Sequence, residues 1–220
     1  MKVCTDACLF GAWVAQIARQ SITDPAAKAL DIGTGTGLLA LMLVQQFAGS
    51  VDAIDIDAAA VQQATENTAV SPWKEKINVH HQSVAQWEPT GYDLIISNPP
   101  FYEQDLKSPH PQKNLAHHDT GLTLGELWKK VRNCIRADGV FALLLPYRRL
   151  EACLQHASDN GFFLCEKILV HQTEKHAPFR VMLLFGLTET VTQSSSIIIK
   201  QEAKYTDAFT ALLKDYYLAL

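Results

Sequence analysis

Two kinds of apolar pattern alternate along the chain. Short, nearly continuous apolar runs bounded by glycine, proline or charged residues are typical of buried strands, and apolar residues at every third or fourth position are typical of helices. The predicted strands are residues 29–32, 51–56, 77–81, 92–97, 140–145, 162–171 and 180–187. The predicted helices are residues 9–19, 38–47, 58–70, 124–136, 149–160 and 205–217.

The strand–helix–strand order predicts an α/β, doubly wound fold. Such a fold has a mostly parallel sheet with helices on both faces. We expect residues 1–220 to form a single domain, because no repeat, low-complexity tract or Pro/Gly linker divides the chain. Ligands of these sheets bind outside the carboxyl ends of the strands, near the point where the strand order reverses. Residues that carry chemistry are therefore expected just after strands.

Local signals set several element boundaries. Thr123 and Glu126 have the spacing of a capping box and are expected to start the helix that follows them. Asp138-Gly139 is expected to stop that helix. Pro146 is expected to end the strand that comes next.

The composition is typical of a globular protein. With 48% hydrophobic and 19% charged residues, a chain of 220 residues can bury a large core. No apolar run approaches the roughly 20 residues of a membrane span, and the first residues lack the pattern of a secretory signal. The five cysteines form no C-x-x-C pair and are typical of reduced thiols. We therefore expect a cytoplasmic protein that does not contact a membrane.

The charge is unevenly distributed. The net charge is −4, yet residues 107–149 hold eight Lys or Arg against three Asp or Glu. An acidic body with one basic stretch suits a protein that meets a polyanion on one face. The alternative is that Lys129, Lys130, Arg132 and Arg136 form the solvated side of an amphipathic helix.

A glycine-rich turn follows the first predicted strand. Its sequence Gly33-Thr34-Gly35-Thr36-Gly37 is preceded by Asp31, and Leu38 stands where a dinucleotide G-x-G-x-x-G fingerprint needs its third glycine. The G-x-G-x-G spacing resembles motif I of class I S-adenosylmethionine-dependent methyltransferases. The resemblance implies that the turn passes under the methionine and ribose of the cofactor, with Asp31 near its amino group. The implied cofactor-binding residues of this segment are Asp31, Gly33, Thr34, Gly35 and Gly37.

An acidic residue ends the second predicted strand. Asp55 stands 22 positions after Gly33, where a carboxylate can accept hydrogen bonds from both ribose hydroxyls. Ile56 beside it is counted with the cofactor site, and Asp57 is expected to cap the next helix. After the third strand this fold usually places an acid near the adenine amino group. The chain has Ser83 and Val84 there, and we expect the Ser83 hydroxyl or the Val84 N–H to substitute.

The fourth predicted strand ends in Asn98-Pro99-Pro100-Phe101. Two successive prolines remove two backbone donors and stiffen the turn. A plain structural turn could use the same residues. Because they follow a strand of a sheet that also carries the glycine turn, we assign them to catalysis. The tetrapeptide matches the [NDS]-P-P-[YFW] motif of methyltransferases that act on exocyclic or amide nitrogens.

The residue types suit the methylation of an adenine amine. The N6 lone pair is delocalised into the ring, and acceptors aimed at its protons favour a pyramidal amine with a localised lone pair. The Asn98 side-chain oxygen and the Pro99 carbonyl are these acceptors, and they also stabilise the positive charge that reaches the nitrogen. Phe101 offers a ring on which an extruded base can stack. No general base is assigned.

With both motifs present, the whole chain resembles the bacterial tRNA1(Val) adenine-N6 methyltransferase family. The segments that carry the likeness are residues 2–13, 71–73, 93–102 and 205–217. The resemblance implies a class I methyltransferase fold with a seven-stranded sheet whose last strand is antiparallel, S-adenosylmethionine as cofactor, and methylation of the adenosine 3′ of the anticodon. It also implies that Thr5 and Asp6 close over the cofactor. Family members usually carry further aromatic and basic residues before Lys2-Val3, so this chain is expected to begin short.

The expected partner is the anticodon stem-loop of tRNA. Loop nucleotides are inexpensive to unstack, which favours them as targets of an enzyme that extrudes a base. We expect the protein to be a monomer. We expect no metal ion, because His117-His118-Asp119 and His80-His81 lack further ligands at a suitable spacing. The candidate RNA-binding residues are Lys107 and Lys113 in the loop after the motif, Lys129, Lys130 and Arg132 on the helix, and Lys175 and Arg180 on the last strand pair.

Other functions share parts of this pattern. N-methyltransferases of ribosomal RNA, DNA adenine or protein glutamine use the same chemistry, but each usually carries a further domain that this chain does not show. A scaffold subunit that binds S-adenosylmethionine and RNA without activity would not need the Asn98-Pro99-Pro100-Phe101 turn. We therefore favour an active tRNA methyltransferase.

Overall fold

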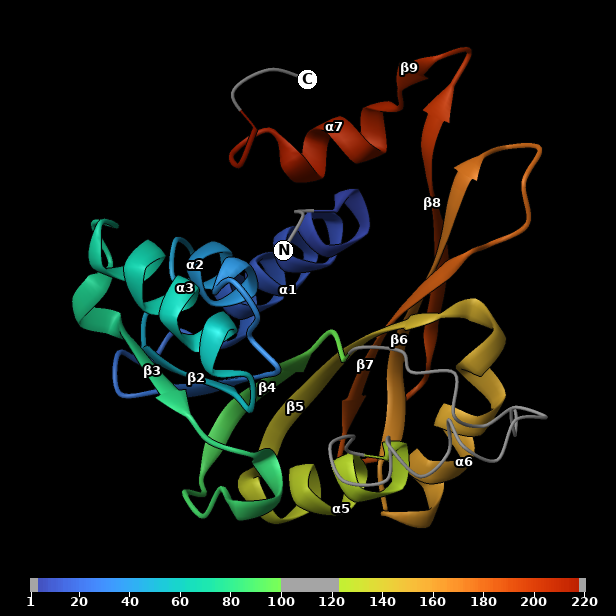
Figure 1. The fold of residues 1–220 in the computed structure, drawn as a ribbon. Helices are drawn as coiled ribbons and strands as arrows, with labels where there is room; N and C mark the ends of the chain where they lie inside the picture. The colour runs from blue at the N-terminus through green and yellow to red at the C-terminus, as the bar shows by residue number, and fades with distance from the viewer. Residues whose placement is uncertain (1–3, 100–122, 218–220) are drawn as a thin grey trace, which may run out of the picture.

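The fold is taken from a computed structural model, which describes residues 4–99 and 123–217. Helices and strands alternate through most of the chain, as Figure 1 shows. The strands are β1 (Lys28–Ile32), β2 (Ser50–Asp55), β3 (Ile77–His81), β4 (Tyr92–Ser97), β5 (Ile135–Pro146), β6 (Phe163–Thr173), β7 (Arg180–Gly186), β8 (Gln193–Gln201) and β9 (Lys204–Tyr205). The helices are α1 (Thr5–Ser21), α2 (Leu38–Leu43), α3 (Ala58–Ala69), α5 (Leu124–Cys134), α6 (Leu150–Asp159) and α7 (Asp207–Leu213).

The strands form one sheet in the order β3-β2-β1-β4-β5-β7-β6-β8-β9. β1 pairs in parallel with β2 on one side and with β4 on the other, so the strand order reverses between β1 and β4. β7 runs antiparallel to both β5 and β6. The predicted doubly wound class I fold is confirmed, and the reversal point places a ligand site at the carboxyl ends of β1 and β4.

The predicted count of seven strands is wrong, because the sheet continues through β8 and β9. β8 pairs in parallel with β6, and β9 pairs antiparallel with β8. The first four residues of β8, Gln193–Ser196, are exposed and polar, so their sequence lacks the apolar alternation that marks a strand. Two strands therefore run against the others, β7 inside the sheet and the two-residue β9 at its edge.

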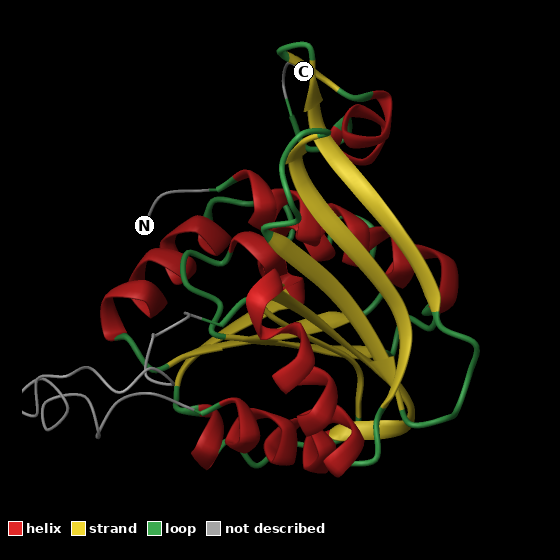
Figure 2. Cartoon of the chain, turned by 90° about the vertical axis from the view of Figure 1, so that its right-hand side faces the viewer, coloured by secondary structure: helices red, strands yellow, loops and turns green. Residues whose placement is uncertain are grey.

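Helices cover both faces of the sheet (Figure 2). The side chains of α1, α2 and α7 share one core cluster, and those of α5 and α6 share the other. Strand residues alternate between the two: Leu94 and Ile96 of β4 join the first cluster, and Ile95 joins the second. The buried Trp128 of α5 anchors the second cluster, with its ring centroid 4.8 Å from that of Phe185.

The junction between α5 and β5 departs from the sequence prediction. The Thr123–Glu126 capping box is confirmed, but α5 ends at Cys134 and β5 begins at Ile135. Asp138 and Gly139 therefore lie within β5, where the pairing with β4 shifts register between Tyr92 and Leu94. A Cβ at Gly139 would lie 2.7 Å from the Tyr92 carbonyl oxygen. The glycine permits a close backbone approach at a bulge and does not end the helix.

Among the described residues, none of the helices has both the length and the apolar character needed to cross a membrane.

Candidate functional site

The glycine turn is held against the end of β2. The backbone N–H groups of Gly33 and Thr34 both donate to the Ile54 carbonyl oxygen, at 2.9 and 3.0 Å. Gly33, Gly35 and Gly37 have φ values of 73°, 58° and 79°, a region that side chains with a Cβ rarely adopt. The turn thus presents bare backbone at the carboxyl edge of the sheet.

Asp31 is a buried carboxyl beneath this turn. It has no exposed surface, and its Oδ2 accepts a hydrogen bond of 2.7 Å from the Thr34 hydroxyl. The pKa of Asp31 is raised to about 7, mainly by burial and also by the nearby Asp55 charge, while its hydrogen bonds oppose the rise. Its Oδ1 accepts no hydrogen bond from the described residues. Because buried polar atoms normally have partners, this oxygen fits a ligand donor such as an ammonium group.

Asp55 ends β2 beside the turn. Its Oδ2 accepts from the Gly35 N–H at 2.9 Å, and its Oδ1 accepts from the Asp57 N–H at 2.9 Å. Each carboxylate oxygen can accept a second hydrogen bond, so the fixed carboxylate keeps capacity for two ribose hydroxyls. Asp57 accepts from the Ala59 N–H and caps α3, which confirms that prediction. The Ile56 side chain is 56% exposed, an apolar surface next to Asp55 that suits a purine ring.

The residues after β3 form a short 3-10 turn, Val84–Gln86. The Ser83 hydroxyl accepts a hydrogen bond from the Ala85 N–H at 3.3 Å and so caps this turn. Val84 is buried, so its side chain serves the core. The adenine contacts expected of Ser83 and Val84 stay a prediction.

Asn98 and Pro99 follow β4 next to the glycine turn. Ser97 pairs with Ile32 across the two parallel strands, and the buried Ser97 hydroxyl donates to the Ile32 carbonyl oxygen at 2.8 Å. This register sets Asn98 alongside Gly33. Both Asn98 and Pro99 are half-buried. The other two residues of the predicted catalytic motif, Pro100 and Phe101, lie outside the described residues.

The start of α1 is tied to the same edge of the sheet. Arg180 begins β7, and its Nε donates to Asp6 Oδ2 at 2.7 Å. Burial raises the pKa of Asp6, but hydrogen bonds from Cys4 and Arg180 and the Arg180 charge outweigh it and leave the pKa below its ordinary value. Thr5 is the first residue of α1 and is half-buried. The predicted contacts of Thr5 and Asp6 with the cofactor are compatible with this position and stay a prediction.

The candidate RNA-binding residues fall into different settings. Lys129 and Arg132 are exposed on α5, whereas the Lys130 amine donates to the Ala85 carbonyl oxygen at 3.2 Å. Lys175 is exposed in the turn between β6 and β7, and Arg180 holds Asp6. Lys107 and Lys113 lie outside the described residues.

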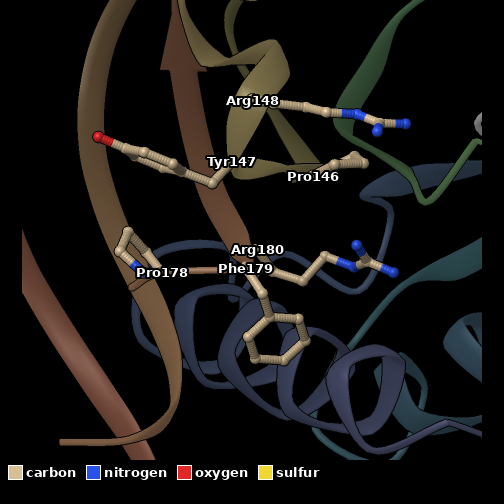
Figure 3. Close-up of a pocket in the computed structure, with 6 residues that line it drawn as sticks. All are labelled: Pro146, Tyr147, Arg148, Pro178, Phe179 and Arg180. Carbon is tan, nitrogen blue, oxygen red and sulfur yellow. The ribbon is translucent and has the colours of Figure 1, made fainter. Parts of the chain in front are cut away.

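A pocket of about 610 Å³ opens where β5 ends and β7 begins (Figure 3). Its lining residues are Pro146, Tyr147, Arg148, Pro178, Phe179 and Arg180. Of these residues, the sequence predicts RNA binding for Arg180 and the end of a strand for Pro146. The available signal was the run Tyr147-Arg148-Arg149 directly after a predicted strand, where ligand-binding residues are expected.

Comparison with known proteins adds a family to this geometry. The model of the Methyltransferase small domain matches residues 14–128. The chain is 40% identical over 226 residues to the tRNA1(Val) (adenine(37)-N6)-methyltransferase of Citrobacter koseri, covering 99% of this chain and 89% of that protein. It is 36% identical to the protein of the same name from Parabacteroides distasonis, covering 100% and 92%. The chain belongs to this family.

Solved structures support the fold of this methyltransferase family member. A predicted O-methyltransferase from Agrobacterium tumefaciens superposes with a TM-score of 0.71 at 13% identity, covering 94% of this chain and 95% of that one. The ribosomal protein L11 methylase of Lactobacillus delbrueckii subsp. bulgaricus gives 0.59 at 21% identity, covering 81% and 77%. At these identities the likeness shows the fold alone.

Proposed function

We propose that the chain transfers a methyl group from S-adenosylmethionine to N6 of adenine 37 in tRNA1(Val). The observation that carries this proposal is the match over nearly the whole chain to methyltransferases of that name, at 40% identity. The half-buried Asn98-Pro99 pair beside the glycine turn supports it. The proposal includes a cytoplasmic location and a monomer that acts on the anticodon stem-loop.

The buried Asp31 carboxyl, the half-buried Asp55 carboxylate and the glycine turn fit the cofactor. When bound, S-adenosylmethionine supplies a methyl group on a positively charged sulfur. Asp31 Oδ1 would accept from its ammonium group, and the fixed Asp55 carboxylate would accept from its ribose hydroxyls. The exposed Ile56 side chain would pack against the adenine ring. The bare backbone of the glycine turn lets the ligand approach closely.

The end of β4 would orient the target amine. The Asn98 side-chain oxygen and the Pro99 carbonyl would accept hydrogen bonds from its two N–H groups, which localises the nitrogen lone pair toward the methyl carbon. The sulfonium of the bound cofactor would supply the methyl group to the amine that Asn98 and Pro99 hold, with the sulfur keeping the electron pair, and the extra proton of the methylated amine would pass to water. Phe101 would stack on the extruded base. Positioning supplies most of the rate, so no general base is needed.

A transfer assay with a labelled cofactor tests the proposal. The protein is incubated with methyl-labelled S-adenosylmethionine and unmodified tRNA1(Val) transcript, and nucleosides are then separated by mass spectrometry. We expect label in N6-methyladenosine from the wild-type transcript and none from a transcript with guanine at position 37. Cofactor binding without any transfer would instead favour the scaffold function.

A further inference from the structure

The pocket between β5 and β7 opens on the edge of the sheet that carries the proposed active site. Ser97, the last residue of β4, pairs with Leu143 of β5. β5 extends three residues beyond this pair to Pro146, which pairs with Arg180 at the start of β7. Strands in a sheet lie about 4.8 Å apart, so β7 lies about 10 Å from β4. The pocket therefore lies across β5 from the Asn98-Pro99 pair, on the side of β4 away from the glycine turn.

The two walls of the pocket are joined by the backbone. The Tyr147 N–H donates to the Phe179 carbonyl oxygen at 3.2 Å. The Arg180 guanidinium lies 5.6 Å from the centre of the Phe179 ring and is also fixed by Asp6. These contacts fix the backbone of both walls and the Arg180 side chain before any ligand arrives, which lowers the entropy cost of binding.

The Tyr147 ring lies apart from the two arginine side chains of the pocket (Figure 3). Arg148 and Arg180 extend to the same side of the pocket, and the Tyr147 ring lies on the opposite side (Figure 3). Tyr147 is 40% exposed, so its ring is accessible to a ligand. Guanidinium groups are well suited to phosphate, and exposed aromatic rings to the stacking of unpaired bases.

We propose that this pocket binds the RNA nucleotide that neighbours the methylated adenosine, with its base stacked on Tyr147 and its backbone phosphate held by Arg148. The inference rests on the proposed function and adds a second nucleotide site to it. An extruded adenine leaves its neighbour without a stacking partner, and the Tyr147 ring replaces that contact. Arg180 contributes by holding the pocket wall against the start of α1 through its contact with Asp6.

Binding of unmodified tRNA1(Val) transcript to variants tests the second site. Tyr147→Ala removes the ring, and Phe163→Ala is its control, because Phe163 is 39% exposed and pairs with Gly186 at the end of β7 away from the pocket. Arg148→Gln removes the charge, and Arg19→Gln in the last turn of α1 is its control. The dissociation constant is measured over a series of salt concentrations, with S-adenosylmethionine affinity and melting temperature measured alongside.

We expect Tyr147→Ala to weaken transcript binding about fivefold or more, the effect of losing one stacked base. Arg148→Gln should weaken binding and lower the salt slope by about one, while Arg148→Lys, which keeps the charge, should restore the slope. Both controls should bind like wild type, and cofactor affinity and melting temperature should not change.

Two results would overturn the second site. One is transcript binding by Tyr147→Ala and Arg148→Gln that equals wild type, while wild type still methylates the transcript; the proposed function would then stand alone. The other is loss of cofactor affinity in both variants, which would place the pocket in the cofactor site. Failure of wild type to methylate any tRNA would instead refute the proposed function.

Discussion

Asp31 shows at the scale of one residue how burial sets up a binding site. Burial raises the pKa of Asp31 to about 7, so below that pH the folded chain without ligand favours the neutral carboxyl. A bound ammonium group favours the ionised form. Affinity for S-adenosylmethionine should therefore fall as the pH drops below about 7, approaching tenfold per pH unit when one proton must leave. Calorimetry from pH 5 to pH 8 measures this.

Asp31→Asn is the matched control, because it keeps the shape of the side chain without the charge. It should bind more weakly at pH 8 and lose most of the pH dependence that wild type shows. Without ligand, the free energy of unfolding of the wild type should change with pH in the direction opposite to the affinity. A raised folded-state pKa stabilises the fold at low pH, so the free energy of unfolding should decrease as pH rises from about 4 to about 7. If the affinity of the wild type for S-adenosylmethionine were independent of pH, Asp31 would not bind the ammonium group of the cofactor.

Asn98 tests the catalytic assignment at the same scale. Asn98→Ala deletes one of the two acceptors proposed for the target amine. Loss of one such preorganised polar group from an active site costs about 10²–10³ in kcat. We expect a loss of that size in methyl transfer, with S-adenosylmethionine affinity nearly unchanged. An equal loss of transfer and of cofactor affinity would show that Asn98 serves the cofactor and not the amine.

At the scale of elements, the α5–β5 junction depends on the absence of a side chain at Gly139. In Gly139→Ala the added carbon would lie 2.7 Å from the Tyr92 carbonyl oxygen and 2.8 Å from Ile135 Cγ1. Overpacking of this kind costs about 1–3 kcal/mol, which urea unfolding will measure. Gly125→Ala is the control, because its Cβ would meet His156 at 3.4 Å on a helix. Equal stability of the two variants would show that the bulge can relax.

The exposed basic residues of α5 allow a test of whether the basic stretch contacts RNA. Lys129 and Arg132 are exposed, so reversing both to Glu leaves the core and the Lys130 contact with Ala85 intact. If this face meets the anticodon stem, the reversal should raise the KM for tRNA and flatten its salt dependence. Lys214→Glu on the exposed end of the chain should change neither. If the double variant had the same KM and salt slope as the wild type, this helix face would be solvated and would not contact RNA.

At the scale of the whole molecule, much of the fold could be predicted because burial leaves a direct mark on sequence. β3 and β4 have the bounds that their apolar runs predict, and α5 begins where its capping box predicts. β8 could not be predicted in this way, because its first half is polar and exposed. Its place is set by pairing with β6, a long-range contact that no local pattern records.

The candidate site divides in the same way. The glycine turn and Asp55 are local features with a recognisable spacing, and the structure brings them together through the bond from the Gly35 N–H. The pocket at Tyr147 and Phe179 joins two segments that are distant in the sequence, so it becomes visible only when β5 and β7 pair. The Asp6–Arg180 ion pair has the same origin.

The central claim is that this chain methylates adenine 37 of tRNA1(Val) through the Asn98-Pro99 turn. Mass spectrometry of anticodon-loop nucleosides from cells that lack the gene tests it most directly. We expect adenine 37 to be unmodified in those cells, N6-methyladenosine to return with the wild-type gene, and Asn98→Ala to fail to restore it. Full N6-methylation of adenine 37 in cells without the gene would contradict the account.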